Sequence, residues 1–347
     1  MDSANNFRQN LSEGLVIPLL SWYNDNQRDL PWRRDPTAYH VWLSEIMLQQ
    51  TRVAAVLDYY RRFLTVLPCV ADLAGCAEET LMKLWQGLGY YSRARNLQKA
   101  ARVIMEVHGG EFPSDYAAIR ALPGVGDYTA GASASIAFGQ PRAAVDGNVL
   151  RVLSRVTANP QDITAQATKR ACAAAVEEIL PVRTPGAFNQ ALMELGATVC
   201  LPNGAPLCDR CPLRQFCLAY ERDLTAALPR KAPKKARRVE ERRVYLIFSG
   251  NRVALRRRAE TGLLAGLWEY PNEVSPAAPP VAGRVDFART AKHIFTHIEW
   301  HMTAYTVQAE SDALPDGWVW ADRAELAEKY SVPNAFQAFE QIVEEHL

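Results

Sequence analysis

Apolar residues recur at intervals of three and four through the first two thirds of this 347-residue chain, and the pattern stops near residue 226. Such spacing places one apolar stripe on a helix and predicts an amphipathic helix wherever it persists. It is clearest in segments 41–50, 53–67, 97–107, 145–156 and 186–199. Turn signals separate these segments at Leu67-Pro68, Gly109-Gly110, Pro113-Ser114, Asn159-Pro160 and Thr184-Pro185. Residues 1–226 are therefore expected to form an all-α domain.

A short basic stretch follows the helical part. Its cationic residues are Arg230, Lys231, Lys234, Lys235, Arg237, Arg238, Arg242 and Arg243. Pro229 and Pro233 disfavour a helix at its start. We interpret 227–243 as an interdomain linker, which either connects the domains as a solvated segment or contacts nucleic-acid phosphates.

Strand patterns appear after the linker. Segments 244–248 and 253–257 predict a hairpin around Ser249-Gly250-Asn251, and 301–307 predicts another strand. Segment 334–346 predicts a closing helix. Residues 244–347 are therefore expected to form a second, α+β domain.

The composition is that of a globular protein, with 48% apolar and 22% charged residues. No apolar run approaches the roughly 18 residues that span a membrane. Met1 to Asn10 is polar, so no secretory signal is expected and the cytoplasm is the expected compartment. Seven cysteines would remain reduced there. The net charge of +1 neither favours nor excludes nucleic-acid binding.

Four of the cysteines are closely spaced. Cys200, Cys208, Cys211 and Cys217 form C-x7-C-x2-C-x5-C, which indicates one metal centre. Zinc and iron–sulfur clusters both accept four thiolates, so the spacing leaves both open. The remaining Cys69, Cys76 and Cys172 show no ligand spacing, and we expect them to be buried as small apolar side chains.

Segment 115–138 predicts two helices joined by a glycine turn that contains Gly124 and Gly126. Asp127 is a candidate N-cap of the second helix. Free N–H groups at that helix start form an anion site, as in helix–hairpin–helix binding to DNA phosphates. A plain αα-turn is the alternative, because glycine turns are common.

Two carboxylates are predicted to lie in opposite environments. Glu45 has Val41, Trp42 and Leu48 as helical neighbours, so burial is expected to raise its pKa and suit it to general acid catalysis, unless it lies on a polar helix edge. Asp146 precedes a helix start, where an N-cap would keep it ionised. A capping role alone is the alternative for Asp146. Glycosidic cleavage needs one carboxylate of each kind.

The order of these features resembles the endonuclease III superfamily of DNA glycosylases. The segments LPWR (30–33), WLSEIMLQQT (42–51), GLGYYSRARN (87–96) and VDGNV (145–149) resemble signatures of its MutY family. The resemblance implies an all-α helix–hairpin–helix glycosylase domain over 1–226, with a six-helix barrel module and a [4Fe–4S] module, and then a Nudix-like domain over 244–347. It also implies an adenine DNA glycosylase that removes adenine mispaired with 8-oxoguanine or guanine.

The resemblance assigns roles to individual residues. Glu45 matches the acid that protonates adenine N7, and Asp146 matches the carboxylate that stabilises the sugar cation. Tyr128 and Asn148 match supporting catalytic residues. Tyr128 also stands where lyase members place a lysine, so no Schiff base is expected there and the enzyme would be monofunctional.

Further residues match binding positions. Those around the flipped adenine are Arg28, Trp32, Arg33, Leu48 and Gln190, and those toward the DNA and the lesion are Gln50, Thr51, Leu88, Tyr90, Gly124, Gly126, Phe295, Thr296 and His297. Extruding the base would let it reach the pocket. Without the resemblance, the apolar members of these sets would be interpreted as core residues.

The family favours a [4Fe–4S] cluster over zinc for the four cysteines, although its first interval usually holds six residues and this chain has seven. We expect 203–205 to absorb the extra residue. Segment 262–271 (GLLAGLWEYP) best matches the Nudix-like domain, and no Nudix box is present, so pyrophosphate hydrolysis is not expected. Thr296 stands where the family commonly has serine.

We therefore expect a monomer whose partner is double-stranded DNA containing A:8-oxoguanine or A:G mispairs. A bifunctional pyrimidine-lesion glycosylase/AP lyase of the endonuclease III type is the alternative, which Tyr128 disfavours. A catalytically silent DNA-binding or iron-sensing protein is a third hypothesis, and the presence of both Glu45 and Asp146 argues against it.

Overall fold

The structure is a computed structural model, and it describes residues 7, 11–233, 236–275 and 278–347. Lys234 and Lys235 of the basic stretch lie outside the described residues. The expectation about a secretory signal rests on residues 1–10, and of these only Phe7 is described. Among the described helices, none combines the length and apolar character that crossing a membrane requires.

The chain forms two compact units. The first consists of Met1–Tyr60, Cys69–Ala74 and Asn96–Pro233, and the second of Arg61–Pro68, Gly75–Arg95 and Lys234–Leu347. Two segments of the helical part, 61–68 and 75–95, thus group with the C-terminal strands rather than with the other helices.

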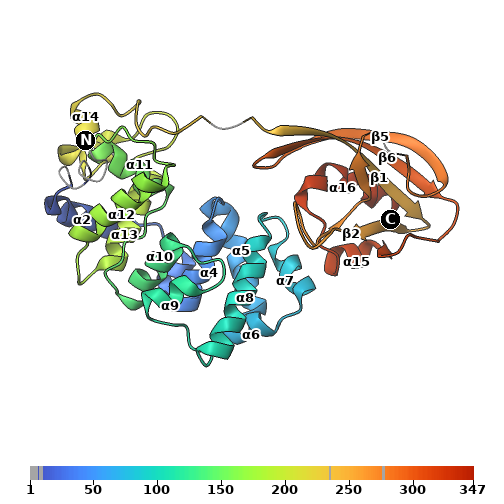
Figure 1. Cartoon of the computed structure of the whole chain (residues 1–347), viewed down its shortest axis with the longest axis horizontal. Coiled ribbons are helices and arrows are strands. Elements are labelled where there is room, and N and C mark those ends of the chain that lie inside the picture. Colours follow the sequence, from blue (N-terminus) through green and yellow to red (C-terminus); the bar gives the residue numbers. More distant parts are fainter. Residues whose placement is uncertain (1–6, 8–10, 234–235, 276–277) are drawn as a thin grey trace. The chain divides into compact units, whose positions relative to one another are not determined.

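The described residues before residue 222 form a helical part (Figure 1). Its elements are η1 (Glu13–Leu15), α2 (Val16–Asn26), α3 (Pro31–Arg34), α4 (Ala38–Leu48), α5 (Val53–Val66), α6 (Val70–Gly75), α7 (Glu78–Trp85), α8 (Ser92–Val107), α9 (Tyr116–Ala121), α10 (Asp127–Phe138), α11 (Gly147–Val156), α12 (Gln166–Ile179), α13 (Pro185–Thr198), η2 (Cys208–Arg210), η3 (Arg214–Phe216) and α14 (Leu218–Glu221). The five segments with the clearest helical spacing are confirmed as α4, α5, α8, α11 and α13.

Helix α10 lies at the centre of the first unit because its side chains are small. Its sequence, DYTAGASASIAF, lets α4, α9 and α13 approach it closely. At Gly131 a Cβ atom would lie 2.1 Å from the carbonyl oxygen of Ala143, so only glycine fits there. Helix α4 is buried along almost its whole length, and Thr37 caps it by accepting a hydrogen bond from the backbone N–H of His40.

The second unit contains a mixed sheet. Its strands are β1 (Arg238–Ser249), β2 (Arg252–Arg257), β3 (Trp268–Glu269), β4 (Asn272–Val274), β5 (Gly283–Ile294), β6 (Ile298–Ala309) and β7 (Trp318–Ala321). The order is β3-β2-β1-β6-β5, with β4 beside β1 and β7 beside β2. Strands β1 and β6 are parallel and the other pairs antiparallel. Helices α15 (Arg323–Glu328), η4 (Asn334–Phe339) and α16 (Glu340–His346) complete the chain.

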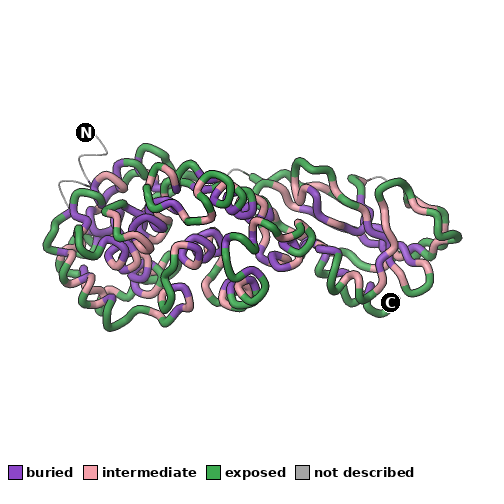
Figure 2. The backbone as a smooth tube through the Cα atoms, turned by 90° about the horizontal axis from the view of Figure 1, so that it is seen from below, coloured by how far each residue is buried: buried purple, intermediate pink, exposed green. Residues whose placement is uncertain are grey.

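Side-chain alternation along β1 separates two apolar cores. Val244, Leu246 and Phe248 pack with η4 and α16 on one face, while Tyr245 and Ile247 pack with Val307 and neighbouring aromatic rings on the other. Period-two alternation is what a strand between two packed layers requires. Figure 2 shows the resulting buried interior and the exposed loops.

Part of the predicted linker is a strand. Strand β1 begins at Arg238, because its backbone pairs with β6 from Arg238 opposite Ile298 onwards. Residues 238–243 therefore belong to the sheet, contrary to the expectation of a linker over 227–243. Earlier in the same stretch, the Arg230 carbonyl accepts a hydrogen bond from the Ile163 N–H, 3.1 Å away, which ties this residue to the first unit.

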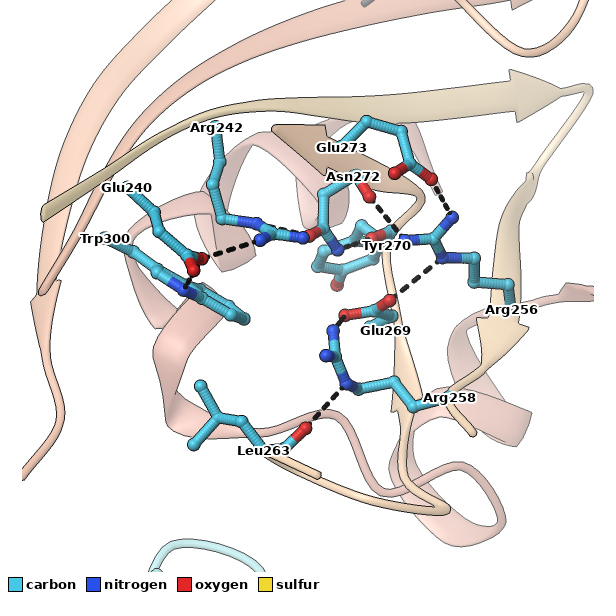
Figure 3. Close-up of polar contacts among 10 residues, drawn as sticks. All are labelled: Glu240, Arg242, Arg256, Arg258, Leu263, Glu269, Tyr270, Asn272, Glu273 and Trp300. Carbon is cyan, nitrogen blue, oxygen red and sulfur yellow. Dashed lines mark hydrogen bonds and ion pairs between the residues drawn. The ribbon is translucent and has the colours of Figure 1, made fainter. Parts of the chain in front are cut away.

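A polar network connects β2, β3 and β4 (Figure 3). Glu269 is 1% exposed, and its two oxygens bind Arg256 at 2.9 Å and Arg258 at 2.5 Å. Arg242 lies over the Trp300 ring, and Glu240 accepts a hydrogen bond from the indole N–H of Trp300. Since both oxygens of the buried Glu269 carboxylate are paired with arginines, Glu269 serves to hold these strands together.

Candidate active site

Glu45 is a buried carboxylic acid on α4. It is only 6% exposed, so the alternative of a polar helix edge is wrong. Burial raises the pKa of Glu45 to about 7, opposed by a hydrogen bond from the Tyr128 hydroxyl to Glu45 Oε2. The negative charge of Asp146 raises this pKa further, and the positive charge of Arg33 lowers it. Glu45 is therefore partly protonated at neutral pH, as a general acid must be.

Asp146 is the N-cap of α11, as predicted. One carboxylate oxygen accepts hydrogen bonds from the backbone N–H groups of Asn148 and Val149, both at 2.8 Å, and the other accepts one from Asn148 Nδ2 at 2.7 Å. Burial nevertheless raises the pKa of Asp146 above its usual value, and these hydrogen bonds oppose the rise. The local sequence shows the cap but not this burial, which depends on distant parts of the chain.

Asn148 is itself held in place. Its Oδ1 accepts a hydrogen bond from Arg151 Nη2 at 2.8 Å, and Arg151 Nε donates to the carbonyl of Cys200 at 2.8 Å. Because Asn148 has its Oδ1 fixed, its amide nitrogen points at Asp146. The supporting role predicted for Asn148 therefore has a geometric basis.

The two carboxylates line one cleft of about 1130 Å³ in the first unit. The other predicted site residues that line it are Arg28, Trp32, Arg33, Leu48, Gln50, Thr51, Gly126, Tyr128, Asn148 and Gln190. Those with no place in its lining are Leu88, Tyr90, Gly124, Phe295, Thr296 and His297. The sequence could not show whether Glu45 and Asp146 meet, and the fold brings them together because α4, α10 and α11 surround the same cleft.

Glu194 is a cleft residue that the sequence reasoning missed. It lies on α13, its side chain is 0% exposed, and it pairs with Arg28 and Arg33. Burial alone would raise its pKa, but hydrogen bonds from Arg28 and Arg33 lower it to about 2. The sequence contains one signal for Glu194. It lies four residues after Gln190, on the same helix face, and the two arginines predicted at the pocket require a negatively charged partner.

The glycine hairpin has the local geometry that its sequence predicts. Gly124 has φ of +76°, and a Cβ there would lie 2.6 Å from Asn96 Cβ. Gly126 is the N-cap of α10, so the prediction that Asp127 caps this helix is wrong. Asp127 is the first helical residue, and its carboxylate binds Arg120 of α9 at 2.6 Å. This ion pair links the two helices of the hairpin.

Gln50 and Tyr90, two of the residues predicted to lie toward the DNA and the lesion, share an unusual backbone conformation. Gln50 and Tyr90 are non-glycine residues with φ of +59° and +48°, and both side chains are exposed. Positive φ in such residues is sparsely populated and is common at functional sites. Thr51 is half-buried, whereas Leu88 is buried, so of these residues only Leu88 is unavailable at the surface.

Phe295, Thr296 and His297 form the turn between β5 and β6. The Phe295 N–H donates a hydrogen bond to the Ile298 carbonyl at 2.8 Å, and the ring centroids of Phe295 and Trp300 lie 4.9 Å apart. Thr296 and His297 remain exposed. Within the second unit, the hydroxyls of Tyr90 and Thr296 lie 2.9 Å apart.

The four closely spaced cysteines line one cavity, together with Arg155 and Arg214. Arg155 Nη1 lies 3.2 Å from Cys200 Sγ. Among the described residues, no group of three or more His, Cys, Asp or Glu side chains is arranged to hold a single metal ion. Of the other cysteines, Cys172 is buried but Cys69 is exposed, contrary to expectation, because it lies in the turn before α6.

Known proteins provide an independent comparison. A family model described as HhH-GPD superfamily base excision DNA repair protein matches residues 43–178, and one described as NUDIX domain matches residues 243–341. The adenine DNA glycosylase of Mus musculus is 37% identical over an alignment 397 positions long, which covers 93% of this chain and 77% of the mouse protein. This chain belongs to the adenine DNA glycosylase family.

Other relatives agree. The adenine DNA glycosylase of Buchnera aphidicola subsp. Schizaphis graminum is 34% identical over 255 residues, 73% of each chain. A solved structure of a thermostable thymine-DNA glycosylase has a TM-score of 0.54 at 30% identity and covers 64% of this chain and 100% of that chain. The expected fold class is confirmed, with a helical glycosylase domain followed by a Nudix-like domain.

Family membership also decides between the reaction types. The protein is a monofunctional adenine DNA glycosylase of base excision repair, and the bifunctional pyrimidine-lesion enzyme is set aside. The structure agrees with this choice, because a tyrosine hydroxyl, rather than an amine, contacts Glu45.

Proposed function

We propose that this enzyme binds double-stranded DNA and removes adenine mispaired with 8-oxoguanine or with guanine, with Glu45 as the general acid. The observation that carries the proposal is the buried Glu45, whose pKa of about 7 lets it hold a proton at physiological pH. Asp146 in the same cleft supplies the second carboxylate that glycosidic cleavage needs.

The proposed reaction assigns one task to each group. The Glu45 proton moves to adenine N7, and the bonding electrons of the C1′–N9 bond leave with the base. The Asp146 carboxylate stabilises the sugar cation that remains. Water then adds to C1′ and gives its proton to the Glu45 carboxylate, which restores the acid and leaves an abasic site. Tyr128 and Asn148 hold the two carboxylates through the hydrogen bonds described above.

The adenine would have to leave the DNA stack to reach Glu45. We assign it to the part of the cleft lined by Arg28, Trp32, Arg33, Leu48 and Gln190. Trp32 packs edge-on against Tyr60, with the ring centroids 5.2 Å apart, and so forms a rigid wall there. A wall of this kind excludes water from the base.

Other exposed residues would bind the surrounding DNA. The backbone N–H groups at the start of α10, after Gly124 and Gly126, are suited to a phosphate. Gln50 and Tyr90, with Thr51 near Gln50, would enter the duplex at the lesion. The turn of Phe295, Thr296 and His297 would recognise 8-oxoguanine, with the hydroxyl of Thr296 replacing the serine hydroxyl of relatives.

We further propose that Cys200, Cys208, Cys211 and Cys217 hold a [4Fe–4S] cluster. All four line one cavity, and four thiolates are the ligand set of such a cluster. The Arg155 guanidinium beside Cys200 would offset the negative charge of thiolate ligands. When bound, the cluster supplies iron–sulfur bonds that cross-link residues 200–217. Gly204, with φ of +74°, lies in the exposed loop that would accommodate the extra residue.

The test is single-turnover release of adenine from duplexes that carry adenine opposite 8-oxoguanine, guanine or thymine. We expect fast release opposite 8-oxoguanine, slower release opposite guanine and little release opposite thymine. Equal rates opposite all three bases would refute the proposed mispair preference. No release from any duplex by protein with its full iron content would refute the proposed activity.

A further inference from the structure

Glu194 is a buried charge that the proposed reaction does not use. It lies on α13, one helical turn after Gln190, and both side chains line the cleft. Its neighbours on the helix, Leu192 and Leu195, are fully buried in the apolar core. A carboxylate in such surroundings is costly unless it is paired and hydrogen-bonded.

Four hydrogen bonds satisfy this carboxylate. Oε1 accepts from the Arg28 backbone N–H at 3.1 Å and from Arg28 Nε at 2.6 Å. Oε2 accepts from Arg28 Nη2 at 2.9 Å and from Arg33 Nη2 at 2.7 Å. Arg33 Nη1 also donates to the Arg28 carbonyl at 3.0 Å. The three side chains form one network of two positive charges and one negative charge.

Arg33 connects this network to Glu45, because Arg33, Glu194 and Glu45 line the same cleft. The positive charge of Arg33 favours the ionised form of Glu45, against the effects of burial and of Asp146. The charged or titratable groups that face Glu45 are Tyr128 from α10, Asp146 before α11 and Arg33 from α3. Those that face Glu194 are Arg28, Arg33 and the phenol of Tyr23 on α2. Arg33 is thus the group that acts electrostatically on both carboxylates.

We propose that Glu194 is a positioning residue that fixes Arg28 and Arg33 at the adenine pocket and, by neutralising Arg33, keeps Glu45 in its acid form. Without the Glu194 charge, two uncompensated guanidiniums would remain beside the cleft, and their field would favour the Glu45 carboxylate. Glu45 would then lose its proton at a lower pH. This inference rests on the proposed role of Glu45 as the general acid.

A purely structural role makes a different prediction. If Glu194 only joins segment 28–33 to α13, its loss lowers the melting temperature and scales the rate by the same factor at every pH. If it neutralises Arg33, its loss moves the alkaline limb of the pH–rate profile. The position of that limb therefore distinguishes the two roles.

The experiment measures single-turnover adenine release from pH 5 to pH 9 for the whole protein with its cluster. For Glu194→Gln we expect the alkaline limb to move about one pH unit lower, and the rate above pH 7 to fall about tenfold. The rate near pH 5.5 should change much less. Glu194→Asp keeps the charge and should restore the position of the limb.

Two further variants strengthen the test. Arg33→Gln should move the limb to higher pH, and combining it with Glu194→Gln should bring the limb back, because the network then keeps its original net charge through Arg28. Asp29→Asn is the matched control, because Asp29 pairs with Arg34 at the surface of the same segment and contributes nothing to the cleft lining. It should leave the limb unchanged.

The outcomes are distinct. A limb that stays in place in Glu194→Gln, with all rates lowered equally, overturns the proposal and leaves a structural role. If Glu194→Gln does not fold, the absence of any upward shift in Arg33→Gln overturns it instead. If the unaltered protein releases no adenine at any pH, the proposed function has failed, which is a different result from an unmoved limb.

Discussion

At the scale of single residues, the proposed chemistry depends on the burial of ionisable side chains. Glu45 and Asp146 are both surrounded by protein, and burial raises the pKa of each. Their hydrogen-bond partners differ, because Glu45 receives one phenol hydroxyl while Asp146 receives two backbone N–H groups and an amide. The two carboxylates therefore differ in the number of donors directed at them, and each donor opposes the rise in pKa that burial causes.

Glu45→Gln should abolish adenine release and stabilise the protein at alkaline pH. The pKa of Glu45 is raised from 4.5 to about 7 in the folded state, so its favourable contribution is complete below pH 4.5 and is lost as the pH rises through 7. Glutamine carries no charge to bury, so the variant should gain up to about 3 kcal/mol relative to the native protein between pH 5 and pH 8. Thermal unfolding of the variant and the native protein at pH 5 and at pH 8 measures this difference in stability. A stability difference that does not depend on pH would show that Glu45 titrates normally.

Tyr128→Phe should move the alkaline limb of adenine release to higher pH. The Tyr128 hydroxyl donates a hydrogen bond that lowers the pKa of Glu45, so its removal lets burial raise that pKa above 7. Glu45 would then keep its proton in more alkaline solution. Single-turnover rates across the pH range provide the measurement, and a limb that moves to lower pH would contradict this role of the hydroxyl.

At the scale of elements, short structures between helices carry the proposed DNA and cofactor contacts. The α9–α10 hairpin combines a glycine in the left-handed region with an Arg120–Asp127 ion pair across its two helices. The segment after α13 has little regular structure, and its cysteines line a common cavity.

Gly124→Ala should weaken binding to any duplex, whatever base faces the adenine. The new Cβ would meet Asn96 Cβ at 2.6 Å, and the positive φ costs about 1–2 kcal/mol in addition. Gly139→Ala is the control, because Gly139 has φ of +65° at the other end of α10 with no atom within 4 Å of the added Cβ. Affinity for matched and mismatched duplexes should fall for Gly124→Ala alone. Equal losses in both variants would remove the hairpin from the DNA interface.

Protein isolated without oxygen should be brown and contain roughly four irons per chain. Cys211→Ala should lose this iron, whereas Cys69→Ser should keep it, because Cys69 lies outside the shared cavity. Metal analysis and visible absorption measure both variants. A colourless protein that contains zinc would contradict the assignment of a cluster.

At the scale of the whole molecule, the two units do not follow the division between the helical and strand-forming parts of the sequence. Residues 61–68 and 75–95 belong to the unit that contains the sheet, so removing the chain after residue 226 would leave them without their partners. The role of the Nudix-like part is therefore better tested by point substitution in the full chain.

Thr296→Ala should reduce the preference for 8-oxoguanine over guanine by several-fold, because one hydrogen bond contributes about 0.5–1.5 kcal/mol. Thr296→Ser keeps the hydroxyl and should keep the preference. Thr290→Ala, an exposed position on β5, serves as the control. The ratio of release rates opposite the two bases is the measurement, and an unchanged ratio in Thr296→Ala would exclude this hydroxyl from recognition.

The sequence by itself determined the elements and the identity of the groups within them. Helical spacing located α4 and α11, and the types of neighbouring residue predicted a buried Glu45 and a capping Asp146. These features are local, since they depend on residues within one or two turns. Local features also predicted a cap at Asp127 and a buried thiol at Cys69, whereas in the structure Gly126 is the cap and Cys69 is exposed.

Only the tertiary structure decided which of these groups share one cleft. Glu45 lies on α4, Tyr128 on α10, Asp146 before α11 and Glu194 on α13, and their meeting depends on how these helices pack around the small side chains of α10. The pKa of each carboxylate follows from that packing, because burial and nearby charges come from distant parts of the chain. For this reason the sequence indicated an acid and an anion, while the fold supplied the pairing of Glu194 with Arg28 and Arg33 and the burial that raises the pKa of Asp146.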